Sequence, residues 1–132
     1  MKKYSIKQVI KSNIFLIIFF IVVIIIIFNS NYRINLISES PSITTGIIYN
    51  EKYGNGGWLY LYYSFEVNGK INYGKKTTPY GNKEGFFNRK QFPVIYKEDQ
   101  INLNDLLIEP KDFKKYDLDF PDSLKWILPH LQ

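Results

Sequence analysis

The side chains that could carry acid–base or metal chemistry are few in this sequence. The single histidine, His130, is third from the end of the chain and follows Pro129, a position that favours a surface side chain over a catalytic base. The chain has no cysteine, which excludes disulfides and thiol chemistry and, with one histidine, leaves no metal-ligand set of the usual spacing. Pairs of acids occur in polar connecting segments, at Glu98 with Asp99 and at Asp117 with Asp119. We therefore expect no enzyme, no cofactor and no metal site.

Three glycines, at positions 54, 56 and 57, have the density of a phosphate-binding loop. No lysine–serine pair accompanies them and no helix is expected to follow, both of which such a loop requires. A turn between two strands explains these glycines more simply.

Aromatic residues are the unusual feature of the composition, with 11 Tyr and 10 Phe in 132 residues. Trp58, Tyr60 and Tyr62 alternate along one segment, so a strand there would place all three on one face. With Lys75 from a neighbouring strand they form a candidate interaction surface. Two alternatives are that a second layer of the fold covers this face, or that the rings pack across strands with Lys75 and Thr77.

An apolar run precedes this surface in the chain, at residues 14–28, IFLIIFFIVVIIIIF. It contains no polar, small or helix-breaking side chain. As a helix it rises about 22 Å, and with Val9 and Ile10 as flanks it can cross a thin bilayer. A cleaved signal peptide is the alternative, but no small-x-small pattern follows Phe28. The run lacks ionisable groups and small-xxx-small spacing, which favours a simple anchor over an ion path or a helix-pairing face.

Charge along the chain predicts the topology. Four lysines precede the apolar run without an acid, at Lys2, Lys3, Lys7 and Lys11. Residues 31–132 hold 13 basic and 12 acidic side chains, so almost all of the net charge of +5 belongs to the N-terminal tail. We expect a single-pass protein of the cell membrane, with the N-terminus in the cytoplasm and the C-terminal domain outside it, and no nucleic-acid partner.

This partition gives four segments: a cytoplasmic basic tail at 1–13, a transmembrane anchor at 14–28, a polar stalk at 29–42 and an extracytoplasmic β-rich domain at 43–132. Within the domain, residues 58–67 alternate, and they predict a core face made of Leu59, Leu61, Tyr63, Phe65 and Val67. Asn68 and Gly69 follow as a turn. As a two-residue type I′ turn they would pair Val67 with Lys70 and Phe65 with Asn72, and Ile71 and Tyr73 would lie on the polar face. A three-residue loop with a bulge would pair Glu66 with Lys70, Phe65 with Ile71 and Tyr63 with Tyr73, and we expect this register because it joins apolar to apolar residues and acid to base.

A long loop is expected at residues 77–89, followed by a strand QFPVIYK with Phe92, Val94 and Tyr96 on one side. Pro93 cannot donate to a ladder, so this strand should begin late or lie at an edge. Residues 102–110 fit either a short strand or a helical turn capped by Asn104. Residues 121–129 predict a brief helix that is capped by Asp122 and has one apolar face formed by Leu124, Ile127 and Leu128. We expect this helix to pack over an open end of the sheet. The alternative is that it brings Trp126 to the lipid surface.

Three segments resemble the "domain of unknown function 3592" family of small bacterial membrane proteins: ITTGIIY at 43–49, YYSFEVNGKINYGKK at 62–76 and FPVIYKED at 92–99. The resemblance covers about residues 43–108. It implies a small antiparallel sheet or barrel-like fold facing away from the cytoplasm, and it implies no functional residues because the family has no established activity.

The fold expected is therefore mainly β, with one N-terminal transmembrane helix, a small antiparallel sheet or barrel-like domain and a short C-terminal helix. The expected function is a non-catalytic binding or structural component of the bacterial envelope, with the bilayer as partner through residues 14–28 and an unknown protein as a further partner. The alternative is a membrane-anchored immunity or inhibitor protein directed against a toxin. Small size, the anchor and a charge-polarised domain are compatible with it, since residues 98–122 carry eight acids and three lysines.

Overall fold

The computed structural model describes residues 6–132, with side chains from Asn13 onward. The chain divides into two compact units, the first ending at Arg33 and the second running from Ile34 to Gln132.

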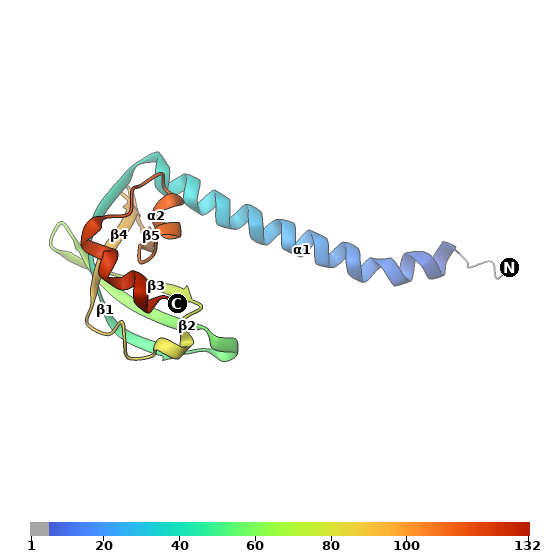
Figure 1. Cartoon of the computed structure of the whole chain (residues 1–132). Helices are drawn as coiled ribbons and strands as arrows, with labels where there is room; N and C mark the ends of the chain where they lie inside the picture. Colours follow the sequence, from blue (N-terminus) through green and yellow to red (C-terminus); the bar gives the residue numbers. More distant parts are fainter. Residues whose placement is uncertain (1–5) are drawn as a thin grey trace. The chain divides into compact units, whose positions relative to one another are not determined.

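Helix α1 spans Ile6–Glu39 (Figure 1). Its residues up to Arg33 belong to the first unit, and the remainder of the helix belongs to the second. Among the described residues, one helix is long and apolar enough to cross a membrane, at Asn13–Glu39. All side chains from Ile14 to Phe28 except Val23 are exposed, as expected of a lipid-facing helix. The side chains of the four N-terminal lysines lie outside the described residues.

The predicted stalk at residues 29–42 is wrong as a separate segment. The helix continues to Glu39, and strand β1 begins at Pro41, so one residue separates them. Ile37 is fully buried in the core of the second unit. The polar residues after Phe28 include no helix breaker before Pro41, which disfavours helical geometry at the residue before it. The second unit therefore begins at Ile34, and residues 29–33, which precede it, are helical.

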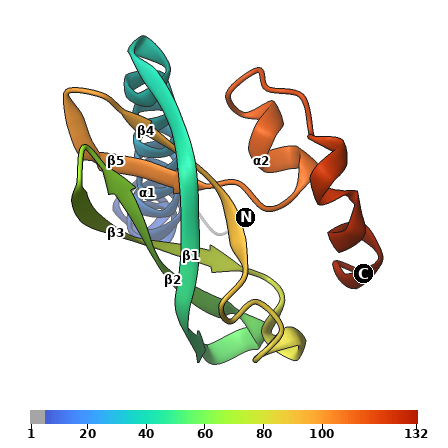
Figure 2. The same ribbon diagram turned by 90° about the vertical axis from the view of Figure 1, so that its left-hand side faces the viewer.

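The second unit is a five-stranded antiparallel sheet in the order β3-β2-β1-β4-β5, curved into a nearly closed barrel (Figure 2). The strands are β1 Pro41–Tyr53, β2 Leu59–Val67, β3 Lys70–Thr78, β4 Gln91–Lys97 and β5 Gln100–Leu106. The short helix η1, Asn55–Gly57, forms the glycine-rich connection between β1 and β2. The predicted fold class is confirmed.

Side chains close the barrel where β3 approaches β5 without a backbone ladder. The hydroxyl of Tyr63 on β2 donates to Oδ1 of Asn104 on β5 over 2.6 Å. Gly74 on β3 permits this contact, because a Cβ at its position would lie 2.2 Å from the Tyr63 ring. Lys76 on β3 reaches Asp105 on β5 at 3.1 Å. The predicted core face of β2 is confirmed, with Leu59, Leu61, Tyr63 and Phe65 buried and Val67 half-buried.

The predicted register of the β2–β3 hairpin is wrong. Val67 pairs with Lys70, Phe65 with Asn72 and Ser64 with Tyr73, so the connection is a two-residue turn. Asn68 and Gly69 have φ values of 52° and 75°, the left-handed conformation that a type I′ turn requires at both central residues. The twist of this turn matches that of the strands and outweighs the better side-chain match of the three-residue loop. As a result Ile71 and Tyr73 lie on the outer face, 64% and 65% exposed.

Strand β4 lies inside the sheet, between β1 and β5, so the prediction of a late start or an edge position is wrong. Pro93 is accommodated because its carbonyl accepts from Leu107 N–H on the β5 side, where the β4–β5 ladder ends. The nitrogen of a strand residue points to the same side as its carbonyl, so the missing donor removes no bond with β1. Phe92, Val94 and Tyr96 share the inner face, and residues 100–106 form a strand rather than a helical turn.

Two short helices, α2 Pro110–Lys114 and η3 Asp122–His130, form the C-terminal segment. The expected helix is a 3₁₀-helix, whose period of about three residues aligns Leu124 with Ile127 and leaves Leu128 37% exposed, contrary to the predicted face. Asp122 is not the cap, since Pro121 holds that position, and Asp122 pairs instead with Lys125 at 2.7 Å. The ring of Trp126 stacks on Phe92, with centroids 6.2 Å apart, which favours packing against the barrel.

Candidate binding surface

The outer face of strands β1, β2 and β3 carries the residues predicted to form an interaction surface. Tyr60 and Tyr62 alternate with the buried Leu61 and Tyr63, so pleating turns them outward. Lys75 on β3 lies opposite Tyr62, and Thr77 lies opposite Tyr60. The Lys75 ammonium is 4.1 Å from the centroid of the Tyr60 ring and 5.8 Å from that of Tyr62. The structure therefore brings these three residues together through cation–π contacts.

Trp58 stands apart from this group. It precedes β2 as the residue that ends η1, and its side chain is 46% exposed. Within residues 13–132 it forms no ring contact with Tyr60 or Tyr62. It borders the surface at the start of β2 and is not packed into it.

Four further apolar side chains on the same outer face were missed by the sequence analysis. Their exposed fractions are 42% for Ile47, 50% for Tyr49, 64% for Ile71 and 65% for Tyr73. Tyr49 is the extra residue of a β-bulge between Ile48 and Asn50, and it meets Tyr73 edge to face with ring centroids 5.9 Å apart. The signal that could have placed Ile71 and Tyr73 outward is the Asn68–Gly69 dipeptide, which favours a two-residue turn.

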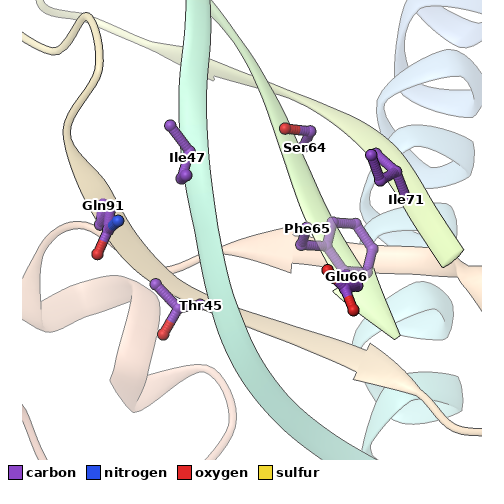
Figure 3. Close-up of a pocket in the computed structure, with 7 residues that line it drawn as sticks. All are labelled: Thr45, Ile47, Ser64, Phe65, Glu66, Ile71 and Gln91. Carbon is purple, nitrogen blue, oxygen red and sulfur yellow. The ribbon is translucent and has the colours of Figure 1, made fainter. Parts of the chain in front are cut away.

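A shallow groove crosses this outer face (Figure 3). Its volume is about 420 Å³. The residues that line it are Thr45 and Ile47 on β1, Ser64, Phe65 and Glu66 on β2, Ile71 on β3 and Gln91 on β4. Ser64 lies between Ile47 and Tyr73 in the same cross-strand row, so the small side chain of the central strand forms the floor. We name this depression the Ser64 groove.

Buried charges form a second cluster, between β3, β5 and α2, that the sequence did not predict. Lys76 is 9% exposed and lies 3.1 Å from Asp105 and 2.9 Å from Asp112, which is 1% exposed. Lys115 lies 3.1 Å from Asp112, and the Tyr116 hydroxyl donates to Asp105 over 3.2 Å. Every group has a partner, and the outward-facing groove residues belong to none of these contacts. We conclude that this cluster is structural.

The pKa of Asp112 reflects this environment. Burial opposes ionisation, but the charges of Lys76 and Lys115 and the hydrogen bonds from Lys76 and the Ile108 N–H outweigh it, so the pKa lies below its usual value. Burial likewise opposes the charge of Lys115, yet Asp112 and neighbouring acids raise its pKa. Burial and a hydrogen bond to Glu109, 2.7 Å away, raise the pKa of Tyr80.

Three of the residues considered for catalysis contact side chains outside that set. His130 packs on Phe86, with ring centroids 4.9 Å apart. Glu98 accepts from the Ser42 hydroxyl over 2.6 Å, and Asp99 lies 3.8 Å from Lys97. In residues 13–132 no group of three His, Asp or Glu side chains is placed to hold a metal ion.

Comparisons with known proteins found no matching family model, no matching curated protein and no matching solved structure.

Proposed function

We propose that this chain is a single-pass membrane protein that holds a small β domain outside the cytoplasm and binds a partner through the outer face of β1–β3, without catalysis. The observation that carries the proposal is the gathering of Ile47, Tyr49, Ile71 and Tyr73 on one uncovered face. Exposed apolar clusters of this kind mark interaction sites in soluble domains. The apolar helix supports the anchoring, and the N-terminal lysines support the orientation. Membership of the family named above stays a prediction.

The orientation can be tested with single cysteines, because the chain has none of its own. Cysteines replace Ser5 in the N-terminal tail and Ser123, which is exposed in η3. An impermeant maleimide added to whole cells should label Ser123→Cys and leave Ser5→Cys unlabelled until the cells are lysed. Labelling of Ser5→Cys alone in whole cells would refute the orientation.

The binding surface can be tested by photo-crosslinking in intact cells. A photoreactive amino acid at Tyr73 should give a crosslinked product, whereas the same group at Lys111, exposed on α2, should not. Equal products from both positions would contradict a specific outer-face site. A secreted toxin as the crosslinked partner would favour the immunity function over an envelope component.

A further inference from the structure

The Ser64 groove combines apolar walls with polar side chains that have no partner. Ile47 and Ile71 lie on either side of Ser64 (Figure 3). Tyr73, which meets Tyr49 edge to face, is paired with Ser64 across the strands. Within residues 13–132 the side chains of Ser64, Glu66 and Gln91 form no hydrogen bond or ion pair. The groove thus offers a hydroxyl, a carboxylate and an amide to a ligand.

This combination limits the chemistry of the ligand. A carboxylate accepts hydrogen bonds, an amide accepts and donates, and a hydroxyl does both, so together they suit a ligand with several neighbouring hydroxyl groups. Ring faces and aliphatic side chains suit a ligand that also presents C–H surfaces. A sugar ring has both properties.

Other ligand classes fit less well. A peptide added as a strand requires a free sheet edge, but the floor of the groove is mid-sheet, where Ser64 is paired with Ile47 on one side and Tyr73 on the other. Glu66 is the one charged residue among those lining the groove, and it disfavours phosphate, sulfate and uronate groups. A purely apolar ligand would bury Glu66 and Gln91 without partners.

We propose that the Ser64 groove binds a neutral saccharide segment, with Glu66 and Gln91 contacting its hydroxyl groups and Ile47, Ile71 and Tyr73 contacting its C–H faces. This inference rests on the proposed function as a binding domain and specifies the chemical class of its ligand.

Calorimetric titration of the full chain in lipid nanodiscs, free of sugar-based detergent, tests the proposal. The probes are cellohexaose, N-acetylated chitohexaose and, as the anionic comparison, hexagalacturonate. We expect at least one neutral hexasaccharide to bind and the anionic one to bind more weakly. Ser64→Phe, which fills the floor, and Glu66→Gln, which removes the charged acceptor, should each weaken that binding by about tenfold.

Thr77→Val is the matched control, because Thr77 is exposed on the same outer face but does not line the groove. It should change the affinity by less than about twofold. Thermal unfolding of each variant verifies the fold, and Glu66→Gln keeps the test valid if Ser64→Phe unfolds. The inference is overturned if neither neutral hexasaccharide binds, if hexagalacturonate binds best, or if both groove variants bind as the control does. The labelling experiment in cells is independent, so failure of saccharide binding and failure of the membrane orientation are distinguishable.

Discussion

The ammonium of Lys76 on β3 lies 2.9 Å from Oδ1 of Asp112 on α2, and both side chains are almost completely buried. This pair connects the barrel to the C-terminal segment across the seam where β3 and β5 share no ladder. The stability of the domain should therefore depend on it more than on any exposed ion pair.

Replacing Lys76 by Met keeps the aliphatic stem and removes the charge. The change removes one partner of a buried ion pair, so we expect the free energy of unfolding to fall by about 3 kcal/mol. The loss should lie at the low end of the range for such changes, because Asp112 still has Lys115 as a charged neighbour and Asp105 still accepts a hydrogen bond from Tyr116. Urea unfolding followed by tryptophan fluorescence measures this. Lys114→Met, at an exposed position on the same helix as Asp112, is the control and should cost less than about 0.5 kcal/mol. Equal costs for the two variants would mean that the buried pair contributes nothing.

Acid should destabilise the domain through Asp112. Its pKa in the folded state lies below the unfolded value of 3.8, so the unfolded state binds more protons as the pH falls. The resulting stability is fully present above about pH 4 and is lost as the pH falls through the folded pKa. Thermal midpoints measured between about pH 2 and pH 7 should decline at the acid end, and Asp112→Asn should reduce this dependence. A midpoint that declined as steeply in Asp112→Asn as in the parent protein would contradict this.

High pH should also destabilise the domain, through two groups whose pKa is raised in the folded state. The pKa values of Lys115 and Tyr80 are both raised in the folded state, so the stability they contribute is present below their unfolded values of 10.5 and 10.0 and is lost as the pH rises above them. Tyr80→Phe removes one of these groups and should weaken the dependence above about pH 10. A thermal midpoint of the parent protein that stayed constant from pH 8 to about pH 11 would contradict this.

The turn residue Gly69 should be sensitive to a side chain although it has room for one. No atom lies within 4 Å of the point that a Cβ would occupy at this position, so the cost of Gly69→Ala comes from its φ of 75° and should be about 1 kcal/mol. Gly69→Asn should cost less, because Asn tolerates the left-handed region. Urea unfolding of the two variants compares them directly, and equal costs would argue against the two-residue turn.

The outward position of Ile71 distinguishes the observed register from the one expected from sequence. Ile71→Ala should change the free energy of unfolding by less than about 0.5 kcal/mol, because the side chain is 64% exposed. Leu61→Ala, at a fully buried site on the neighbouring strand, should cost about 2–5 kcal/mol. A comparable loss of unfolding free energy in Ile71→Ala would support the three-residue loop over the two-residue turn.

Local sequence patterns were sufficient to predict the apolar helix, the β character of the domain and the alternation of β2, because each depends on neighbours within one segment. It also placed Tyr60, Tyr62 and Lys75 on one surface, since a shared strand face and a nearby hairpin were sufficient for that. Ile71 and Tyr73 were assigned to the wrong face because side-chain matching was weighted above the twist of the Asn68–Gly69 turn, and a slip of one residue exchanges the two faces of a strand.

The remaining features could be assigned from the folded domain alone. Ile37 is a core residue because the folded domain packs around the end of α1, which no local pattern reveals. Lys76 and Asp112 meet because the sheet curves until β3 approaches β5 and α2. The Ser64 groove requires three strands in one register. These features depend on contacts between segments far apart in the chain, whereas composition and periodicity report only on residues close together in it.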